Sequence, residues 1–338
     1  MALQGMDGCD LYSDTTDLQR RYPETQVPAY FTISTTLGRF GGGAIHGNNY
    51  NGYVSLPVSG TPTTYYWAGA MKGKALTADR PWLEFANPSL AVICRLTVLT
   101  GGLVRAYRGT GTTLGTSVDP VVTSLGYSFV EVKVVVSSSV GVVEVWTNGA
   151  RILNITGANT EGQTGGISRI WMRTGDSNGW YLDDFYHYDT TGSGVTDFLG
   201  DREIETRRPN GDASVQFTRS GGAANYEMVD ESPGADDDTT YNESGTVEFK
   251  DRLDLQDMAR TPVSIDAVQA VVVDRKTGGG AAEGKVGFYS GTTEGMGAAE
   301  GLGTDYGCQT HIEELNPDDS LAWEEADVNA LQIQYEHA

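Results

Sequence analysis

The chain has 338 residues with 44 glycines, and it lacks long stretches rich in Leu, Ala, Lys and Glu. This composition is typical of an all-β protein with many short strands, and the length allows two domains. The net charge of −22 is unevenly spread, because residues 1–191 carry 13 basic and 15 acidic side chains whereas residues 192–338 carry 10 and 30. The acidic second half argues against nucleic-acid binding, since it would repel the phosphate backbone.

The three cysteines and the N-terminal segment indicate where the protein is made. Cys9, Cys94 and Cys308 are far apart and form no CxxC pair, so neither a disulfide framework nor a zinc site is predicted. The N-terminal residues lack a basic segment followed by an apolar run, and no stretch approaches the roughly 20 apolar residues of a membrane span. We therefore expect synthesis in a reducing compartment, without a secretory signal and without membrane insertion.

Strand-like runs separated by Gly, Pro, Asn and Thr occupy most of residues 29–190. From Val130, apolar residues alternate with Glu131 and Lys133, which indicates a half-buried strand. Further along, Asn148-Gly149 separates two strand-like runs and predicts a type I′ hairpin. The other predicted strands are AYFTIST, NGYVSLPV, TYYWAGAMKG, PWLEFAN, LAVICRLTVL, LVRAYRG, GISRIWMRTG and WYLDDFYHYD. So many short strands predict a sandwich or a barrel.

The segment DTTGSGVTDFLGD is rich in Gly, Ser and Thr, which predicts a boundary between a domain of residues 1–191 and a domain of residues 192–338. The second domain also shows strand-like runs, including SVQFTR, TVEFKDRLDL, SIDAVQAVVVDRK and GKVGFYS, and is predicted to be a β-sandwich. Near its end, DDSLAWEEADVNAL predicts one short helix. Asp319 or Ser320 is its expected cap, and Leu321 is among the residues expected to face the sheet.

The predicted hairpin and the strand that follows it resemble a known family. The segments VGVVEVWTNGARILNITG and GWYLDDFYHYD are similar to the closing part of concanavalin A-like jelly rolls of the laminin-G type. In that family, a hairpin with a W-x-N-G turn precedes a last strand with a doubled aspartate. The resemblance covers about residues 25–190 and implies a concanavalin A-like jelly-roll sandwich in this part of the chain.

Residues 189–338 resemble a segment that is common in structural proteins of tailed bacteriophages, directly after such a jelly roll. The resemblance rests on DTTGSGVTDFLGDREIETRRPNGD, SIDAVQAVVVDRKT and ELNPDDSLAWEEADVNALQIQYE. It implies a virion component, such as a tail, fibre or capsid-decorating protein, that is made in the host cytoplasm without a signal peptide. Its expected partners are other virion proteins and copies of itself, because virion proteins occupy symmetric positions.

Asp183 and Asp184 form a doubled carboxylate in the middle of a predicted strand. Side chains alternate along a strand, so the two should point to opposite faces and should not act together as an acid–base pair. If Phe185 faces the core, Asp183 shares its face, and Asp184 lies on the other face with Leu182 and Tyr186. The resemblance implies structural carboxylates, of which the inward one accepts backbone N–H groups at a sheet edge. A calcium or ligand role is the alternative.

The patterns of catalytic and metal sites are missing from the sequence. Glu131 and Glu144 stand alone in their strands, whereas a glycoside hydrolase needs two carboxylates on either side of one bond. The four histidines lack metal-ligand spacing, and no GxSxG motif occurs. We therefore expect no catalytic residue, no cofactor and no enzymatic activity. The adjacent Asp236, Asp237 and Asp238 lack the alternating spacing of a calcium loop, so a solvated loop is favoured over a calcium site.

Aromatic and amide side chains in two consecutive segments predict a glycan contact. The set consists of Tyr50, Tyr53, Tyr65, Tyr66, Trp67, Asn48 and Asn51. Aromatic rings stack on sugar faces, and amides form hydrogen bonds with sugar hydroxyls. The alternative is that the alternating Tyr and Trp residues belong to the core or to cross-strand pairs.

Three functions are considered, in order of preference. The first is a non-enzymatic structural component of a tailed phage particle, acting in virion assembly and host attachment. The second is a lectin-like adsorption protein that recognises polysaccharide on the host surface. The third is a hydrolase of envelope glycans, which the missing carboxylate pair disfavours.

Overall fold

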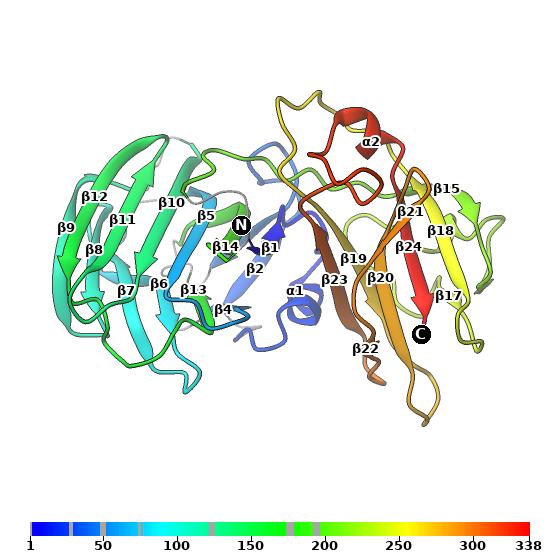
Figure 1. The fold of residues 1–338 in the computed structure, drawn as a ribbon, viewed down its shortest axis with the longest axis horizontal. Coiled ribbons are helices and arrows are strands. Elements are labelled where there is room, and N and C mark those ends of the chain that lie inside the picture. Colours follow the sequence, from blue (N-terminus) through cyan, green and yellow to red (C-terminus); the bar gives the residue numbers. More distant parts are fainter. Residues whose placement is uncertain are drawn as a thin grey trace. The chain divides into compact units, whose positions relative to one another are not determined.

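The structure is a computed structural model, and it describes residues 2–26, 30–47, 52–73, 76, 78–121, 126–173, 179–191 and 197–338. The chain divides into two compact units, Met1–Ile204 and Glu205–Ala338. Both are built from antiparallel strands (Figure 1). The predicted domain boundary lies between residues 191 and 192, whereas the first compact unit continues to Ile204.

Two sheets make up the described part of the first unit. The larger has eight strands: β12 (Ala150–Ala158), β11 (Gly141–Thr147), β10 (Ser128–Val135), β5 (Thr64–Lys72), β14 (Tyr181–Asp189), β3 (Ala44–Gly47) and β2 (Phe31–Ser34) in spatial order, with β1 (Ala2–Asp7) paired to β14. The smaller has six: β4 (Val54–Pro57), β13 (Arg169–Met172), β6 (Arg80–Ala86), β7 (Val92–Val98), β8 (Leu103–Arg108) and β9 (Thr112–Pro120). The helix α1 (Thr15–Arg21) begins after Asp14, whose carboxylate accepts backbone N–H groups of the first turn.

One apolar core lies between the two sheets of the first unit. Val130, Val132 and Val134 of β10 belong to it, in agreement with the alternation in the sequence. Trp67 of β5 meets Trp82 of β6 edge to face, with ring centroids 5.4 Å apart. The structure thus confirms the predicted all-β sandwich.

A second apolar cluster covers the outer face of the eight-stranded sheet, and residues 197–204 help to form it. Tyr66 of β5 is 1% exposed, and the ring of Phe198 packs edge-on against it at 5.4 Å. The N–H of Gly200 donates to Glu131 Oε1 of β10 at 2.7 Å. These contacts explain why the first unit extends beyond residue 191, where the sequence predicts the boundary.

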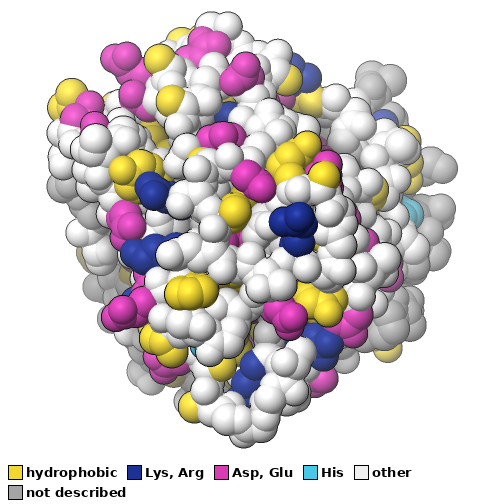
Figure 2. Space-filling model, turned by 90° about the vertical axis from the view of Figure 1, so that its right-hand side faces the viewer, with side chains coloured by type: hydrophobic (Ala, Val, Ile, Leu, Met, Phe, Trp, Pro, Cys, Tyr) yellow, Lys and Arg dark blue, Asp and Glu magenta, His cyan; other side chains and the backbone are white. Residues whose placement is uncertain are grey.

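The second unit contains a further sheet of six strands in its described residues. They are β15 (Pro209–Ser214), β18 (Lys250–Leu255), β24 (Gln332–His337), β20 (Glu283–Ser290) and β21 (Thr293–Met296), with β22 (Glu300–Gly301) paired to β20. Two ribbons add β16 (Thr218–Arg219) with β17 (Asn242–Glu243) and β19 (Val268–Asp274) with β23 (Gly307–Glu313), and a 3-10 turn, η1, spans Tyr226–Met228. A small core includes Phe288, Trp323 and Val328. Figure 2 shows one face of the molecule, on which acidic side chains are spread among separate hydrophobic groups.

The predicted helix of the second unit forms, but it begins later and is shorter. It is α2 (Glu325–Asn329), and its N-cap is Glu324, so the prediction of Asp319 or Ser320 as the cap is wrong. Ser320 has a φ of +61°, which takes the chain out of a right-handed helix at that point. Leu321 is consequently 63% exposed and does not face the sheet. No helix in the described part of the chain is long and apolar enough to cross a membrane.

Candidate functional site

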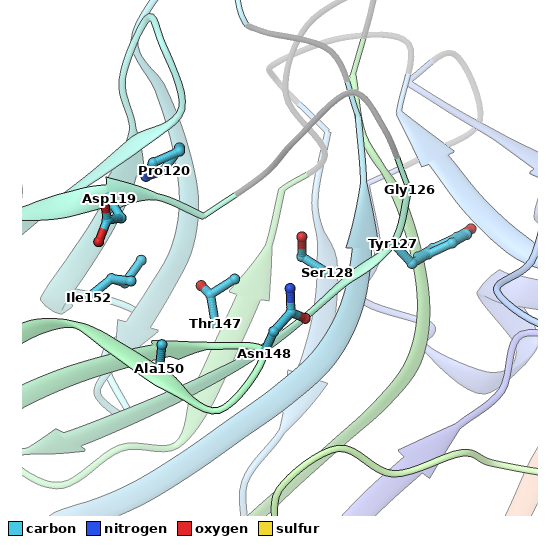
Figure 3. Close-up of a pocket in the computed structure, with 9 residues that line it drawn as sticks. All are labelled: Asp119, Pro120, Gly126, Tyr127, Ser128, Thr147, Asn148, Ala150 and Ile152. Carbon is cyan, nitrogen blue, oxygen red and sulfur yellow. The ribbon is translucent and has the colours of Figure 1, made fainter.

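A pocket of about 450 Å³ opens at one end of the first unit, where β9, β11 and the start of β10 and β12 meet (Figure 3). Its lining consists of Asp119, Pro120, Gly126, Tyr127, Ser128, Thr147, Asn148, Ala150 and Ile152. The volume falls within the roughly 300–1,000 Å³ of small-molecule sites. The sequence pattern marks the hairpin between β11 and β12, but it gives no signal for the pocket, because β9 reaches it only in the folded sandwich.

The hairpin turn holds one amide side chain at the rim of the pocket. Asn148 and Gly149 have φ values of +48° and +77°, which agree with the predicted type I′ turn. Asn148 Oδ1 accepts the N–H of Phe129 at 2.8 Å, and the N–H of Asn148 donates to the Phe129 carbonyl at 2.8 Å. These bonds fix the side chain and do not use the two donors of its amide nitrogen.

Thr147 brings a buried hydroxyl group to the same pocket. Among the residues that the structure describes, no protein atom forms a hydrogen bond with its Oγ1. Figure 3 places this side chain between Ile152 and Ser128, with Asn148 beside it. Because a buried hydroxyl normally has a partner, the pocket suits a ligand that carries hydroxyl groups. Asp119, which is exposed, adds a carboxylate at the rim.

Tyr127 borders the pocket, but its ring points away from the other labelled side chains (Figure 3). Its hydroxyl donates to the Leu37 carbonyl at 2.7 Å, and the Lys72 ammonium lies 5.8 Å from the ring centroid. Burial raises the pKa of this phenol well above its ordinary value. Tyr127 therefore anchors the start of β10 and does not offer its ring face to a ligand in the pocket.

The described residues among those predicted to contact a glycan do not line this pocket. Three of them lie outside the described residues: Asn48, Tyr50 and Asn51. Tyr65 and Trp67 are fully buried between the sheets. Tyr66 lies on the outer face of the larger sheet, in the cluster that Phe198 and Leu199 pack against. Tyr53 is partly exposed and packs against Trp171, with ring centroids 5.4 Å apart. The rings of Tyr65, Tyr66 and Trp67 are therefore buried in the protein, and Tyr53 is the partly exposed ring among the described members of the set.

Asp183 and Asp184 lie at a β-bulge of β14. The register with β5 shifts between Asp183 and Tyr186, and at this point β14 exchanges β3 for β1 as its second neighbour. Asp184 has a φ of +47°. Because of the bulge, Leu182 and Phe185 both point into the core between the sheets, which corrects the strict alternation expected for this strand. The doubled aspartate marks the place where the strand changes partner.

Both carboxylates of the bulge are buried and accept backbone N–H groups. Asp183 accepts from Arg39 at 2.6 Å and from Asp184 at 2.8 Å, and Asp184 accepts from Ile204 at 2.8 Å. The Arg39 guanidinium lies 3.8 Å from Asp184. Burial raises the pKa of both carboxyls above the ordinary value, to about 8 for Asp183, where the Asp184 carboxylate adds to the effect, and to about 7 for Asp184. These contacts hold two loops onto β14.

Two of the three adjacent aspartates of the second unit, Asp236 and Asp238, have separate protein partners. Asp236 accepts from the Thr240 hydroxyl at 2.9 Å, and Asp238 pairs with Arg275 at 2.5 Å and accepts from the Tyr306 hydroxyl at 2.8 Å. Among the described residues, no group of three or more His, Cys, Asp or Glu side chains could hold a metal ion.

Comparisons with known proteins find similarity at the level of fold only. No family model matches the sequence, and no curated protein matches it. An endo-β-1,4-glucuronan lyase from Trichoderma reesei is similar over 56% of this chain and 96% of its own, at 11% identity and a TM-score of 0.42. A sialidase from Trypanosoma rangeli is similar over 47% of this chain and 27% of its own, at 12% identity and a TM-score of 0.34. The galectin LEC-6 from Caenorhabditis elegans is similar over 40% and 91%, at 12% identity and 0.29.

These similar structures correct one prediction from the sequence. The sequence predicts no enzymatic activity, and this prediction is contradicted, because a lyase and a sialidase are among the proteins of similar structure. Similarity at 11–12% identity assigns no activity or substrate to this chain, so its function has to be argued from its own residues.

Proposed function

We propose that the first unit is a carbohydrate-binding β-sandwich that holds part of a glycan in the pocket beside the Asn148-Gly149 hairpin. One observation carries the proposal: the buried Thr147 hydroxyl has no hydrogen-bond partner among the described residues and belongs to the lining of a pocket that also includes the exposed amide side chain of Asn148. Sugar hydroxyls both donate and accept, so one ring can satisfy Thr147 and Asn148 together. A galectin is among the proteins of similar structure, and this agrees with the proposal without carrying it.

A glycan array probed with the full chain, followed by titration calorimetry of each hit, tests the proposal. Thr147→Val keeps the shape of the side chain and removes the hydroxyl, and it should weaken binding about tenfold, because a polar ligand group is left unpaired. The matched control is Thr156→Val, at an exposed position of β12 outside the pocket. Mass spectrometry of the same samples shows whether the bound glycan is also cleaved. Absence of binding at millimolar sugar overturns the proposal.

A second proposal concerns where the protein works. We propose that the chain is a virion component of a tailed phage, synthesised in the host cytoplasm, and that glycan binding serves attachment to the host. The resemblance of residues 189–338 to phage structural proteins supports this, and so does the acidic charge of that region, which keeps assembled copies soluble. Labelling this chain on purified particles and imaging them tests the proposal. Particles that lack the chain contradict it.

A further inference from the structure

The outer face of the six-stranded sheet carries one continuous row of side chains. Paired residues in neighbouring strands form this row, which we call the arginine face: Ser55, Trp171, Glu84, Arg95, Tyr107 and Thr113. Their neighbours along the strands, such as Leu56, Ile170, Phe85 and Leu96, point into the core. Since side chains alternate along a strand, the row lies on the side of the sheet away from the core.

Glu84 organises the centre of the arginine face. Its carboxylate is 1% exposed and accepts from Arg95 Nε at 2.6 Å and from Arg173 Nε at 2.7 Å. The Arg173 guanidinium also lies over the Tyr53 ring, 5.3 Å from its centroid, and Tyr53 packs on Trp171. One buried carboxylate thus fixes two guanidinium groups beside two aromatic rings. Because these side chains are already ordered, they lose less conformational entropy when a ligand binds.

One further arginine, Arg105, gives this face an excess of positive charge. It lies two residues before Tyr107 on β8, so it shares the face of that ring, and it donates to the Thr116 hydroxyl at 3.1 Å. Arg105 has no ion pair with a carboxylate in the described part of the chain. A surface of this sign is unexpected on a chain of net charge −22. It fits a ligand that carries negative charge at intervals along its length.

We propose that the arginine face binds a strand of acidic polysaccharide, with sugar rings on Trp171 and Tyr107 and a uronate carboxylate on Arg105. Trp171 and Tyr107 lie three strands apart, ~14 Å at the usual spacing, which a short oligosaccharide spans. Partly exposed aromatic rings on a sheet offer flat faces for sugars. Nucleic acid is disfavoured, because the chain as a whole repels a densely charged backbone. This surface is separate from the pocket and does not depend on ligand binding there.

Titration of the full chain with oligogalacturonate, and with the same oligosaccharide after methyl esterification, tests the assignment. The acid should bind and the neutral ester should bind at least about tenfold more weakly, and added salt should weaken binding of the acid. Arg105→Gln should lower the affinity for the acid about tenfold. The control is Arg151→Gln, on β12 of the other sheet, and Thr147→Val should also leave this binding unchanged.

Equal binding of the acid and its ester, or no binding of either, overturns the assignment. Sedimentation velocity on the same variants tests the main alternative, in which a second copy of the chain binds to the arginine face. If the full chain self-associates and the Arg105→Gln variant does not, while oligogalacturonate fails to bind, then the face binds a second copy and the proposal is wrong. Loss of glycan-array binding in Thr147→Val, with oligogalacturonate binding retained, would separate this surface from the pocket.

Discussion

The two units differ in how they use acidic side chains. In its described part, the first unit buries Asp7, Asp17, Glu84, Glu131, Asp183, Asp184 and Asp189, whereas the second unit, which has more acidic residues, buries Asp251 and Glu336. The buried carboxylates of the first unit include acceptors of backbone N–H groups and a partner of two arginines. Burial of a carboxylate costs free energy unless such partners exist. The partners of a carboxylate, and not the local density of acids, indicate its role.

The largest expected effect concerns Glu84. Glu84→Ala leaves Arg95 and Arg173 close together without their shared carboxylate, so the free energy of unfolding should fall by about 3 kcal/mol. Denaturant unfolding of the full chain measures it. Glu24→Ala is the control, because Glu24 pairs with Arg169 at a site where its side chain is 52% exposed. Equal effects of the two substitutions would show that burial does not strengthen the Glu84 contacts.

The bulge of β14 should make the stability of the first unit depend on pH. The pKa values of Asp183 and Asp184 are higher in the fold than the ordinary 3.8, so their contribution is most favourable below about pH 4 and is lost as the pH rises through 7 to 8. Asp184→Asn keeps the acceptor for the Ile204 N–H and removes one charge. It should therefore raise the free energy of unfolding at pH 8 by about 2 kcal/mol and flatten its change between pH 5 and 8.

Thermal unfolding across this pH range checks the prediction, with Asp197→Asn as the control. Asp197 is exposed and follows β14 in the sequence. Its substitution therefore removes one negative charge and leaves the two carboxylates of the bulge in place. If both variants flatten the profile equally, the general repulsion of an acidic chain causes the pH dependence, and the bulge does not.

The hairpin of the pocket should show a smaller effect. Gly149 has a φ of +77°, where a Cβ atom is strained, so Gly149→Ala should cost about 1 kcal/mol of stability and weaken glycan binding by tilting Asn148. Gly111→Ala is the control, because open space surrounds that position and its φ is not in the left-handed region. Unfolding and calorimetry on both variants measure the two effects. Unchanged glycan binding in Gly149→Ala would separate the hairpin from the ligand site.

The smallest effect is expected in the acidic loop of the second unit. Arg275→Ala removes the partner of the exposed Asp238 and should leave the midpoint of thermal unfolding unchanged, because water screens such a pair. The same scan with added calcium should also show no shift. A rise in the midpoint on adding calcium would contradict the interpretation of this loop as solvated and would assign it an ion.

Several features of the fold follow from short-range patterns and could be predicted. Alternation around Val130 places β10, and Asn148-Gly149 allows the positive φ values of the turn, because both depend on a few neighbouring residues. The helix near the end of the chain was predicted less well, since one residue with positive φ, Ser320, delays its start. The candidate glycan residues could not be predicted in the same way, because the packing of the two sheets decides which aromatic rings reach the surface. Tyr65 and Trp67 are buried by that packing.

The sequence by itself determined the β character of the chain, the type I′ hairpin and the uneven charge, because periodicity, turn chemistry and composition are local properties. Only the tertiary structure decided that residues 197–204 pack on the larger sheet, that Asp183 and Asp184 occupy a bulge between two neighbouring strands, and that Glu84 lies between two arginines. The pocket and the arginine face likewise combine strands that are distant in sequence. Their residues meet because apolar burial closes the two sheets on one core, which no short segment can encode alone.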